Sequence, residues 1–230
     1  MNKNDLEKTT GRRKFLGALG SGAAAMTLAS LVAPIQKAQA GTTDQTDTGN
    51  EDEWFNQIKG KHRILFDVTG PHDVLPFAWP RVFLLTNEKT GTPAKDCNVV
   101  VVLRHDGIPY AMKSDLWAKY KFGEVFKAED PKTKQPSTRN PFWQPAKGDF
   151  QIPGVGEVEI GINELQASGV MFCVCDAALT VYSAVLGGDN AAAVKKEWLA
   201  GLLPGVHVVP SGVWAVGRAQ EHGCHYCFAG

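Results

Sequence analysis

The sequence lacks an excess of charge of either sign. Its 230 residues include 24 Lys and Arg and 24 Asp and Glu, so the formal net charge is zero at pH 7. Proteins that bind nucleic acids normally carry a clear excess of basic residues, so this balance argues against that class. The hydrophobic share of 43% is ordinary, which excludes a collagen-like or wholly disordered chain and allows a sizeable core.

Cysteine is also scarce, and cofactor motifs are missing. Five cysteines are too few for a small disulfide-rich scaffold, and an odd number leaves at least one thiol unpaired in a monomer. Thr69-Gly70 is too short for a phosphate-binding loop, so a flavin is not supported. No internal repeat is visible. The sequence therefore requires no cofactor, although its C-terminal cysteines leave a metal site possible.

The first 40 residues have the pattern of an export signal. A polar start leads to Arg12 and Arg13, then to a weakly apolar stretch over residues 15–35 and to a small-residue triplet that ends at Ala40. This order resembles a twin-arginine signal, cleaved after Ala40, that exports the folded chain to the periplasm. The membrane is then a partner only transiently, during export. An uncleaved membrane anchor over residues 15–35 is the alternative.

Removing this leader changes the charge balance of the chain. Residues 1–40 hold six basic and two acidic residues, which leaves 18 basic and 22 acidic residues and a net charge of about −4. The stretch that follows, over residues 41–60, begins polar and acidic, and we expect it to form a disordered tether. All five cysteines belong to the exported part, whose destination is oxidising.

From residue 61 to the C-terminus, apolar runs alternate with amphipathic stretches. Strands are expected at residues 63–69, 98–103, 170–175 and 206–209. Helices are expected at residues 157–168, 177–186, 190–203 and 212–222. Strands that alternate with helices predict one α/β domain over residues 61–230, a three-layer sandwich around a mainly parallel sheet.

Residues 127–156 interrupt this alternation. They contain five prolines and no clear period, which is unusual inside a compact domain. Phe142 and Trp143 lie within the segment and favour a packed lid or an oligomer contact over disorder. We therefore predict a proline-rich insertion there.

Cys175 is the strongest candidate for chemistry. It lies at the carboxyl end of a predicted buried strand and directly before a helix. Ligands bind at this edge of open parallel sheets, and a helix N-terminus stabilises a thiolate. A plain buried cysteine is the alternative. Cys173, two residues earlier, faces the same side of an extended strand and is assigned to packing, because a Cα separation of about 6.6 Å is at the limit for a disulfide.

Two histidines are expected at the same edge of the sheet. His72 follows the first predicted strand and His105 follows the second. Either could act as a base or an orienting partner for the Cys175 thiol. The alternative is that both are solvated loop residues.

Cys224 and Cys227 form a C-x-x-C motif close to the C-terminus. The motif follows a predicted helix, whose C-terminal dipole disfavours a thiolate, so a thioredoxin-like site does not fit. Three interpretations stay open: a local disulfide, a resolving pair that reaches Cys175, or a site for zinc or another metal completed by His222 or His225.

Three segments together resemble the DsrE/DsrF-like family. They are FCVCDAAL at residues 172–179, LPGVHVVPSGV at 203–213 and RAQEHG at 218–223. The resemblance implies a flavodoxin-like sheet of about five strands and frequent homo- or hetero-oligomers. It also implies, for some members, a cysteine that forms a persulfide during sulfur relay, and this cysteine matches Cys175.

These observations lead to one principal hypothesis and two alternatives. The first is an exported sulfur-handling or thiol-redox protein with Cys175 as persulfide-carrying or nucleophilic thiol, and with a sulfur donor, an acceptor or a thiol as partner. The second is a non-catalytic oligomeric binding or assembly subunit. The third is a metal-binding protein that uses the C-terminal C-x-x-C motif.

Overall fold

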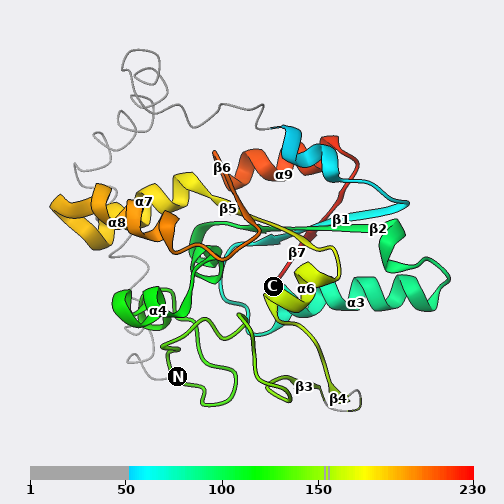
Figure 1. The fold of residues 1–230 in the computed structure, drawn as a ribbon, viewed down its shortest axis with the longest axis horizontal. Coiled ribbons are helices and arrows are strands. Elements are labelled where there is room, and N and C mark those ends of the chain that lie inside the picture. The colour runs from blue at the N-terminus through cyan, green and yellow to red at the C-terminus, as the bar shows by residue number, and fades with distance from the viewer. Residues whose placement is uncertain (1–51, 153, 155) are drawn as a thin grey trace, which may run out of the picture. The chain divides into compact units, whose positions relative to one another are not determined.

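The computed structural model describes residues 52–152, 154 and 156–230 (Figure 1). The export signal predicted over residues 1–40 lies outside these residues, as does the first part of the tether predicted over residues 41–60. Within the described part of the chain, no helix is both long and apolar enough to cross a membrane.

A five-stranded parallel sheet forms the centre of the domain. Its order is β6-β5-β2-β1-β7. The strands span His62–Val68 (β1), Cys97–Leu103 (β2), Met171–Cys175 (β5), Val206–Val209 (β6) and His225–Phe228 (β7). The chain thus steps in one direction from β1 to β6 and then returns, so that β7 lies on the other side of β1. The predicted three-layer α/β, flavodoxin-like architecture with a mainly parallel sheet is confirmed.

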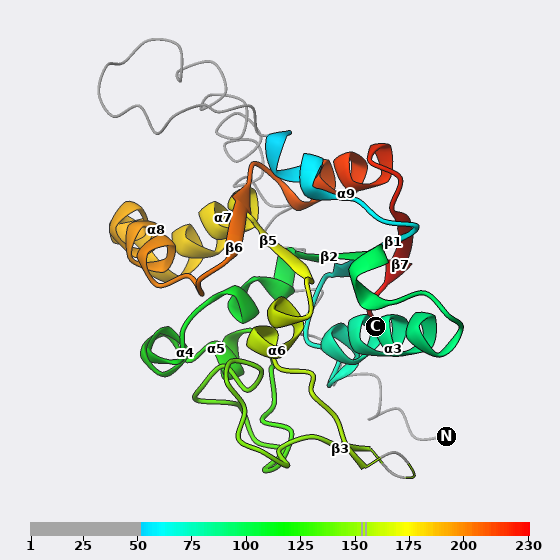
Figure 2. The same ribbon diagram turned by 45° about the vertical axis from the view of Figure 1, so that its right-hand side comes forward.

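Helices cover both faces of the sheet (Figures 1 and 2). The crossovers that step in one direction place their helices on one face, whereas the return step places α9 on the other, as right-handed crossovers require. The helices span Leu75–Lys89 (α3), Ser114–Tyr120 (α4), Phe122–Val125 (α5), Ile162–Ala167 (α6), Asp176–Gly187 (α7), Ala191–Ala200 (α8) and Gly212–Glu221 (α9). Helices α7 and α8 pack against each other.

The core divides into two apolar layers because successive strand residues point to opposite faces. Leu65, Val100 and Val102 lie in the layer beneath α9. Phe66 and Val101 lie in the larger layer on the other face. All five are buried. Strands buried on both faces need apolar residues at every position, which is why Val99–Leu103 of β2 are all apolar.

The prediction of a disordered tether is wrong for the C-terminal part of residues 41–60. Residues Glu53–Gln57 form a short 3-10 helix, η4. Phe55 within it is fully buried, and its ring lies 5.6 Å from that of Trp214 on α9. This part of residues 41–60 therefore belongs to the core beneath α9, because its aromatic side chain has apolar surface to cover.

The proline-rich insertion packs into the larger core layer. Its only strands among the described residues are the two-residue β3 (Gln151–Ile152) and β4 (Gly156–Glu157), which pair antiparallel. The fully buried Asn140 donates to the carbonyls of Tyr110 and Met112, at 2.9 Å each. Phe142 stacks on Phe150 with ring centroids 5.0 Å apart. The segment is thus ordered by internal hydrogen bonds and aromatic packing, and its use as a lid or an oligomer contact stays a prediction.

A partly buried carboxylate ties this insertion together and makes its order sensitive to acid. Asp149 forms ion pairs with Lys132 and Arg139 and accepts from the amide of Ala146 at 2.9 Å. The hydrogen bond from Lys132, ahead of that from Ala146, holds the pKa of Asp149 below its ordinary value of 3.8. A carboxyl group with a lowered folded-state pKa stabilises the fold above its unfolded pKa, and this contribution is lost as the pH falls through the folded value.

We therefore expect the insertion to loosen when Asp149 becomes protonated. Asp149→Asn should raise amide exchange in residues 127–152 at pH 6, measured by hydrogen exchange with mass spectrometry. At a pH below the lowered pKa, wild type and variant should exchange alike in this segment. A difference between them that persisted unchanged in acid would contradict the role of this carboxylate.

Candidate functional site

The carboxyl ends of the parallel strands meet at one edge and bring the candidate thiol to it. Leu103 of β2 pairs with Val174 of β5, and Cys175 pairs with Val209 of β6. The residues that follow, among them Arg104 and Ser211, therefore lie beside Cys175 at the edge where ligands bind in open parallel sheets. The predicted position of Cys175 at the end of a strand is the observed one.

Cys175 itself caps helix α7. Its Sγ accepts a hydrogen bond from the backbone amide of Ala178 at 3.3 Å, and the residue is 6% exposed. The thiol thus lies at the positive end of the dipole of a 12-residue helix, with a backbone donor aimed at it. Both features direct positive charge toward the Cys175 sulfur.

The neighbouring Asp176 does not oppose this, because it has a cation of its own. Lys195 of α8 donates to the Asp176 carboxylate at 2.8 Å and to Thr180 at 2.9 Å. Asp176 is the first residue of α7, and the cap is the cysteine rather than the carboxylate. The Lys195 ammonium offsets the negative charge next to Cys175.

A buried ion pair lies at the same edge, and the sequence analysis missed it. Asp67, at the end of β1, is 1% exposed. Arg104 donates to both of its oxygens, from Nε at 2.6 Å and from Nη2 at 2.8 Å. The Tyr226 hydroxyl donates to Asp67 at 2.9 Å. A carboxylate inside the apolar run Ile64–Val68 was the feature of the sequence that could have revealed it, since a buried charge needs partners.

Arg104 is held between this carboxylate and the start of α9. The hydrogen bonds to Asp67 raise the pKa of Arg104, and the negative charge of Asp67 adds to the effect. A Cβ atom at Gly212 would lie 2.4 Å from the Cβ of Arg104, so only glycine lets the arginine stem pass there. Asp67 and Gly212 therefore fix a cation next to the candidate thiol.

His105 lies at the predicted edge but contacts other groups. Its backbone adopts the left-handed conformation with a φ of 52°, and its side chain is 62% exposed. Nδ1 lies 3.1 Å from the Asp106 carboxylate, which also accepts from the Tyr182 hydroxyl of α7. Burial, followed by this hydrogen bond, raises the pKa of Tyr182.

His72 lies farther from the candidate thiol. Its ring packs edge-to-face against Phe228 of β7, with centroids 5.3 Å apart. Strand β1 is two strands away from β5, a lateral separation of about 10 Å. No hydrogen bond within the described ranges joins Cys175 to His72 or to His105. The structure thus brings both histidines to the edge without placing either against the sulfur.

The C-x-x-C motif is divided between the two faces of the sheet. Cys224 precedes β7 and packs in the layer beneath α9, whereas Cys227 packs against the larger layer. Residues three apart in an extended strand point to opposite sides, which explains the separation. All five cysteines are free. A local disulfide between Cys224 and Cys227 is therefore not formed.

Cys227 is also too far from Cys175 to resolve it within one chain. It pairs with Phe66, which pairs with Val101, which pairs with Phe172. Cys227 thus lies three strands from β5, a lateral distance of about 14 Å. Burial raises the pKa of Cys224 to about 11. Cys227 is therefore not placed to attack a disulfide or persulfide at Cys175 within one chain, and the raised pKa makes Cys224 a poor attacking thiol.

The predicted metal site at the C-terminus is not formed either. His222 ends α9, and His225 pairs with Ile64 at the start of β7, while the two cysteines face apart. Across residues 52–152, 154 and 156–230, no group of three or more His, Cys, Asp or Glu side chains converges on a point where a metal could bind.

No family model matches this sequence, and no curated protein matches it. Among solved structures, a protein of unknown function from Methanobacterium thermoautotrophicum is similar, with 21% sequence identity and a TM-score of 0.34. The similarity covers 73% of this chain and 99% of that one. It concerns the arrangement of the backbone and not the chemistry of the site.

Proposed function

We propose that this chain is an exported sulfur-handling protein in which the Cys175 thiolate accepts a sulfane sulfur atom and passes it on. The observation that carries the proposal is the position of Cys175 at the end of β5, where its sulfur accepts the Ala178 amide at the N-terminus of α7. The resemblance of residues 172–179 to the relay cysteine of the DsrE/DsrF-like family supports it. The periplasmic destination follows from the predicted twin-arginine signal.

The surroundings of Cys175 favour single-thiol chemistry over dithiol exchange. Cys173 is fully buried, and burial raises its pKa, so it is a poor attacking group. The prediction that Cys173 and Cys175 face the same side is wrong: Cys173 packs in the layer beneath α9, whereas Cys175, where β5 gives way to α7, packs in the larger layer. A persulfide on Cys175 needs no second thiol in the same chain.

The proposed reaction is a substitution at sulfur. The Cys175 thiolate attacks the outer sulfur of a donor such as thiosulfate, and a new S–S bond forms as the donor's S–S bond breaks. Sulfite leaves with the bonding electron pair, so the total charge is unchanged and no external oxidant or reductant is needed. An acceptor thiolate then attacks the outer sulfur of the persulfide and restores the Cys175 thiolate.

Arg104 gives this site a preference for anions. Its guanidinium has five N–H donors, and Asp67 takes two of them. The side chain is 27% exposed, so the remaining donors are accessible to an anionic sulfur donor near Cys175. In this proposal Asp67 and Tyr226 are positioning residues for Arg104.

A non-catalytic binding or assembly subunit is the second candidate. Strand β7 is an edge strand of the described sheet, and it exposes Tyr226 and Phe228. Exposed edge strands with aromatic side chains are typical sites of chain association. Such a subunit would bind partners through this edge and leave Cys175 unmodified.

Sulfur loading distinguishes the two candidates. The exported form is incubated with thiosulfate or polysulfide, and its intact mass is measured before and after dithiothreitol. We expect one adduct of about 32 Da per chain that the reductant removes. The Cys224→Ser, Cys227→Ser double variant is the matched control and should load equally. Absence of an adduct from the wild type with both donors would overturn the proposal.

A further inference from the structure

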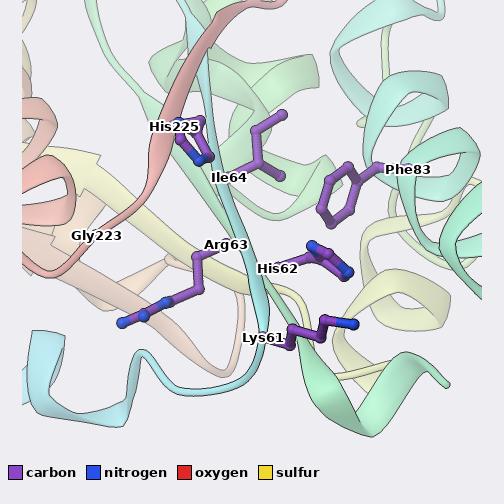
Figure 3. A pocket seen from close by; sticks show the side chains of 7 residues that line it. All are labelled: Lys61, His62, Arg63, Ile64, Phe83, Gly223 and His225. Carbon is purple, nitrogen blue, oxygen red and sulfur yellow. The ribbon is translucent and has the colours of Figure 1, made fainter. Parts of the chain in front are cut away.

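A cavity of about 210 Å³ opens at the amino end of strand β1, the opposite end of the sheet from Cys175 (Figure 3). Its basic lining comes from Lys61, His62, Arg63 and His225. Ile64 and Phe83, the latter from α3, provide an apolar wall. The cavity therefore combines positive charge with apolar surface, and the proposed sulfur chemistry does not use it.

The cavity exists because β7 is shorter than β1. Strand β1 begins at His62, but β7 joins it only at Ile64, which pairs with His225. The chain turns into β7 at Gly223, whose φ of 87° suits glycine. The Arg63 side chain is held next to this turn, because its Nη1 donates to the carbonyl of His222 at 3.0 Å. The notch is thus built from regular strand ends and does not depend on a mobile loop.

The charge in the cavity is of one sign. Every titratable residue of the lining is basic, whereas the chain as a whole is neutral. Among the residues that the structure describes, Lys61, His62, Arg63 and His225 form no ion pair with a carboxylate. Clustered cations without acidic partners attract anions and offer charge-assisted hydrogen bonds.

The apolar wall limits which anions fit. Figure 3 shows the His62 ring beside that of Phe83 on one side of β1, with Ile64 next to them, while Arg63 extends on the other side of the strand. The volume corresponds to about seven water molecules. A small anion that also carries a compact apolar group fills this space better than an inorganic ion does.

We propose that this cavity binds a small organic anion. Its phosphate or carboxylate group would face Lys61, His62 and His225, with Arg63 adding positive charge from across the strand. Its apolar part would pack on Phe83 and Ile64. The shared chemistry is an oxyanion attached to a compact apolar group.

Phenyl phosphate is a suitable probe, titrated calorimetrically into the full chain at low ionic strength in a buffer without phosphate. We expect saturable binding of one probe per chain, and Lys61→Ala should weaken it about tenfold. Lys59→Ala is the matched control, because Lys59 is exposed and does not line the cavity. It should leave the affinity unchanged.

Further arms test the two halves of the lining separately. Benzyl alcohol, a neutral molecule of related shape, should not bind at the same concentrations, and inorganic phosphate should bind more weakly than phenyl phosphate. Cys175→Ser should bind the probe like wild type, so this result is independent of the sulfur chemistry. Equal weakening by Lys59→Ala and Lys61→Ala, or equal binding of the neutral molecule, would overturn the proposed site.

Discussion

Arg104→Met is expected to lower the free energy of unfolding by about 3 kcal/mol. The substitution keeps an aliphatic stem of similar length against Gly212 but leaves the Asp67 carboxylate, 1% exposed, without its cation. Removing one partner of a buried ion pair leaves the other charge unpaired in the protein interior, where it is poorly solvated. Denaturant unfolding followed by circular dichroism measures the change.

A second ion pair in the same region, whose carboxylate is not buried, supplies the matched control. Lys195 pairs with Asp176 at 2.8 Å, and both side chains are partly exposed. Lys195→Met should therefore cost no more than about 1 kcal/mol. The Asp67→Asn, Arg104→Met double variant should recover part of the loss, because it removes the stranded charge. If Arg104→Met lowered the free energy of unfolding no more than Lys195→Met does, the Asp67–Arg104 pair would not be a main source of stability at this edge of the sheet.

Cys175→Ser is expected to reduce sulfur transfer from thiosulfate to cyanide at least about 100-fold, because a serine hydroxyl stays protonated at neutral pH and is a weak nucleophile. The fold should be unaffected, since serine has a similar size and is a good N-cap for α7. Thiocyanate formation measures the transfer: cyanide takes the outer sulfur of the persulfide and releases the Cys175 thiolate.

The Cys224→Ser, Cys227→Ser double variant is the control for this loss. Strand β7 places Cys227 about 14 Å or more from β5. The rate of sulfur transfer by the double variant should therefore stay within about twofold of the wild-type rate. Retained transfer in Cys175→Ser together with loss in the double variant would assign the chemistry to the C-terminal motif instead.

The parallel core was predictable from the sequence, whereas other elements, among them β7 and α3, were not. Strand β2 is buried on both faces, so every residue of Val99–Leu103 is apolar and the run is evident. Strand β7 is a short edge strand with mostly exposed side chains, and its four residues carry no such pattern. Helix α3 contains Pro80 in its interior, which in a sequence indicates a break rather than a 15-residue helix.

The candidate site likewise has one part that the sequence predicts and one part that it does not. The position of Cys175 follows from a local transition, strand to helix, that five or six residues display. The Asp67–Arg104–Tyr226 cluster joins residues 37 and 159 positions apart, and no spacing rule connects them. The Cys224 and Cys227 spacing suggested one site, but a strand turns residues three apart to opposite faces.

Whether Cys175 carries the transferred sulfur is decided by a site-resolved mass measurement. Protein loaded with thiosulfate is alkylated, digested and analysed by tandem mass spectrometry. We expect an added mass of about 32 Da on Cys175 and none on Cys224 or Cys227. An unmodified Cys175 in protein that carries the added sulfur on Cys224 or Cys227 would contradict this expectation.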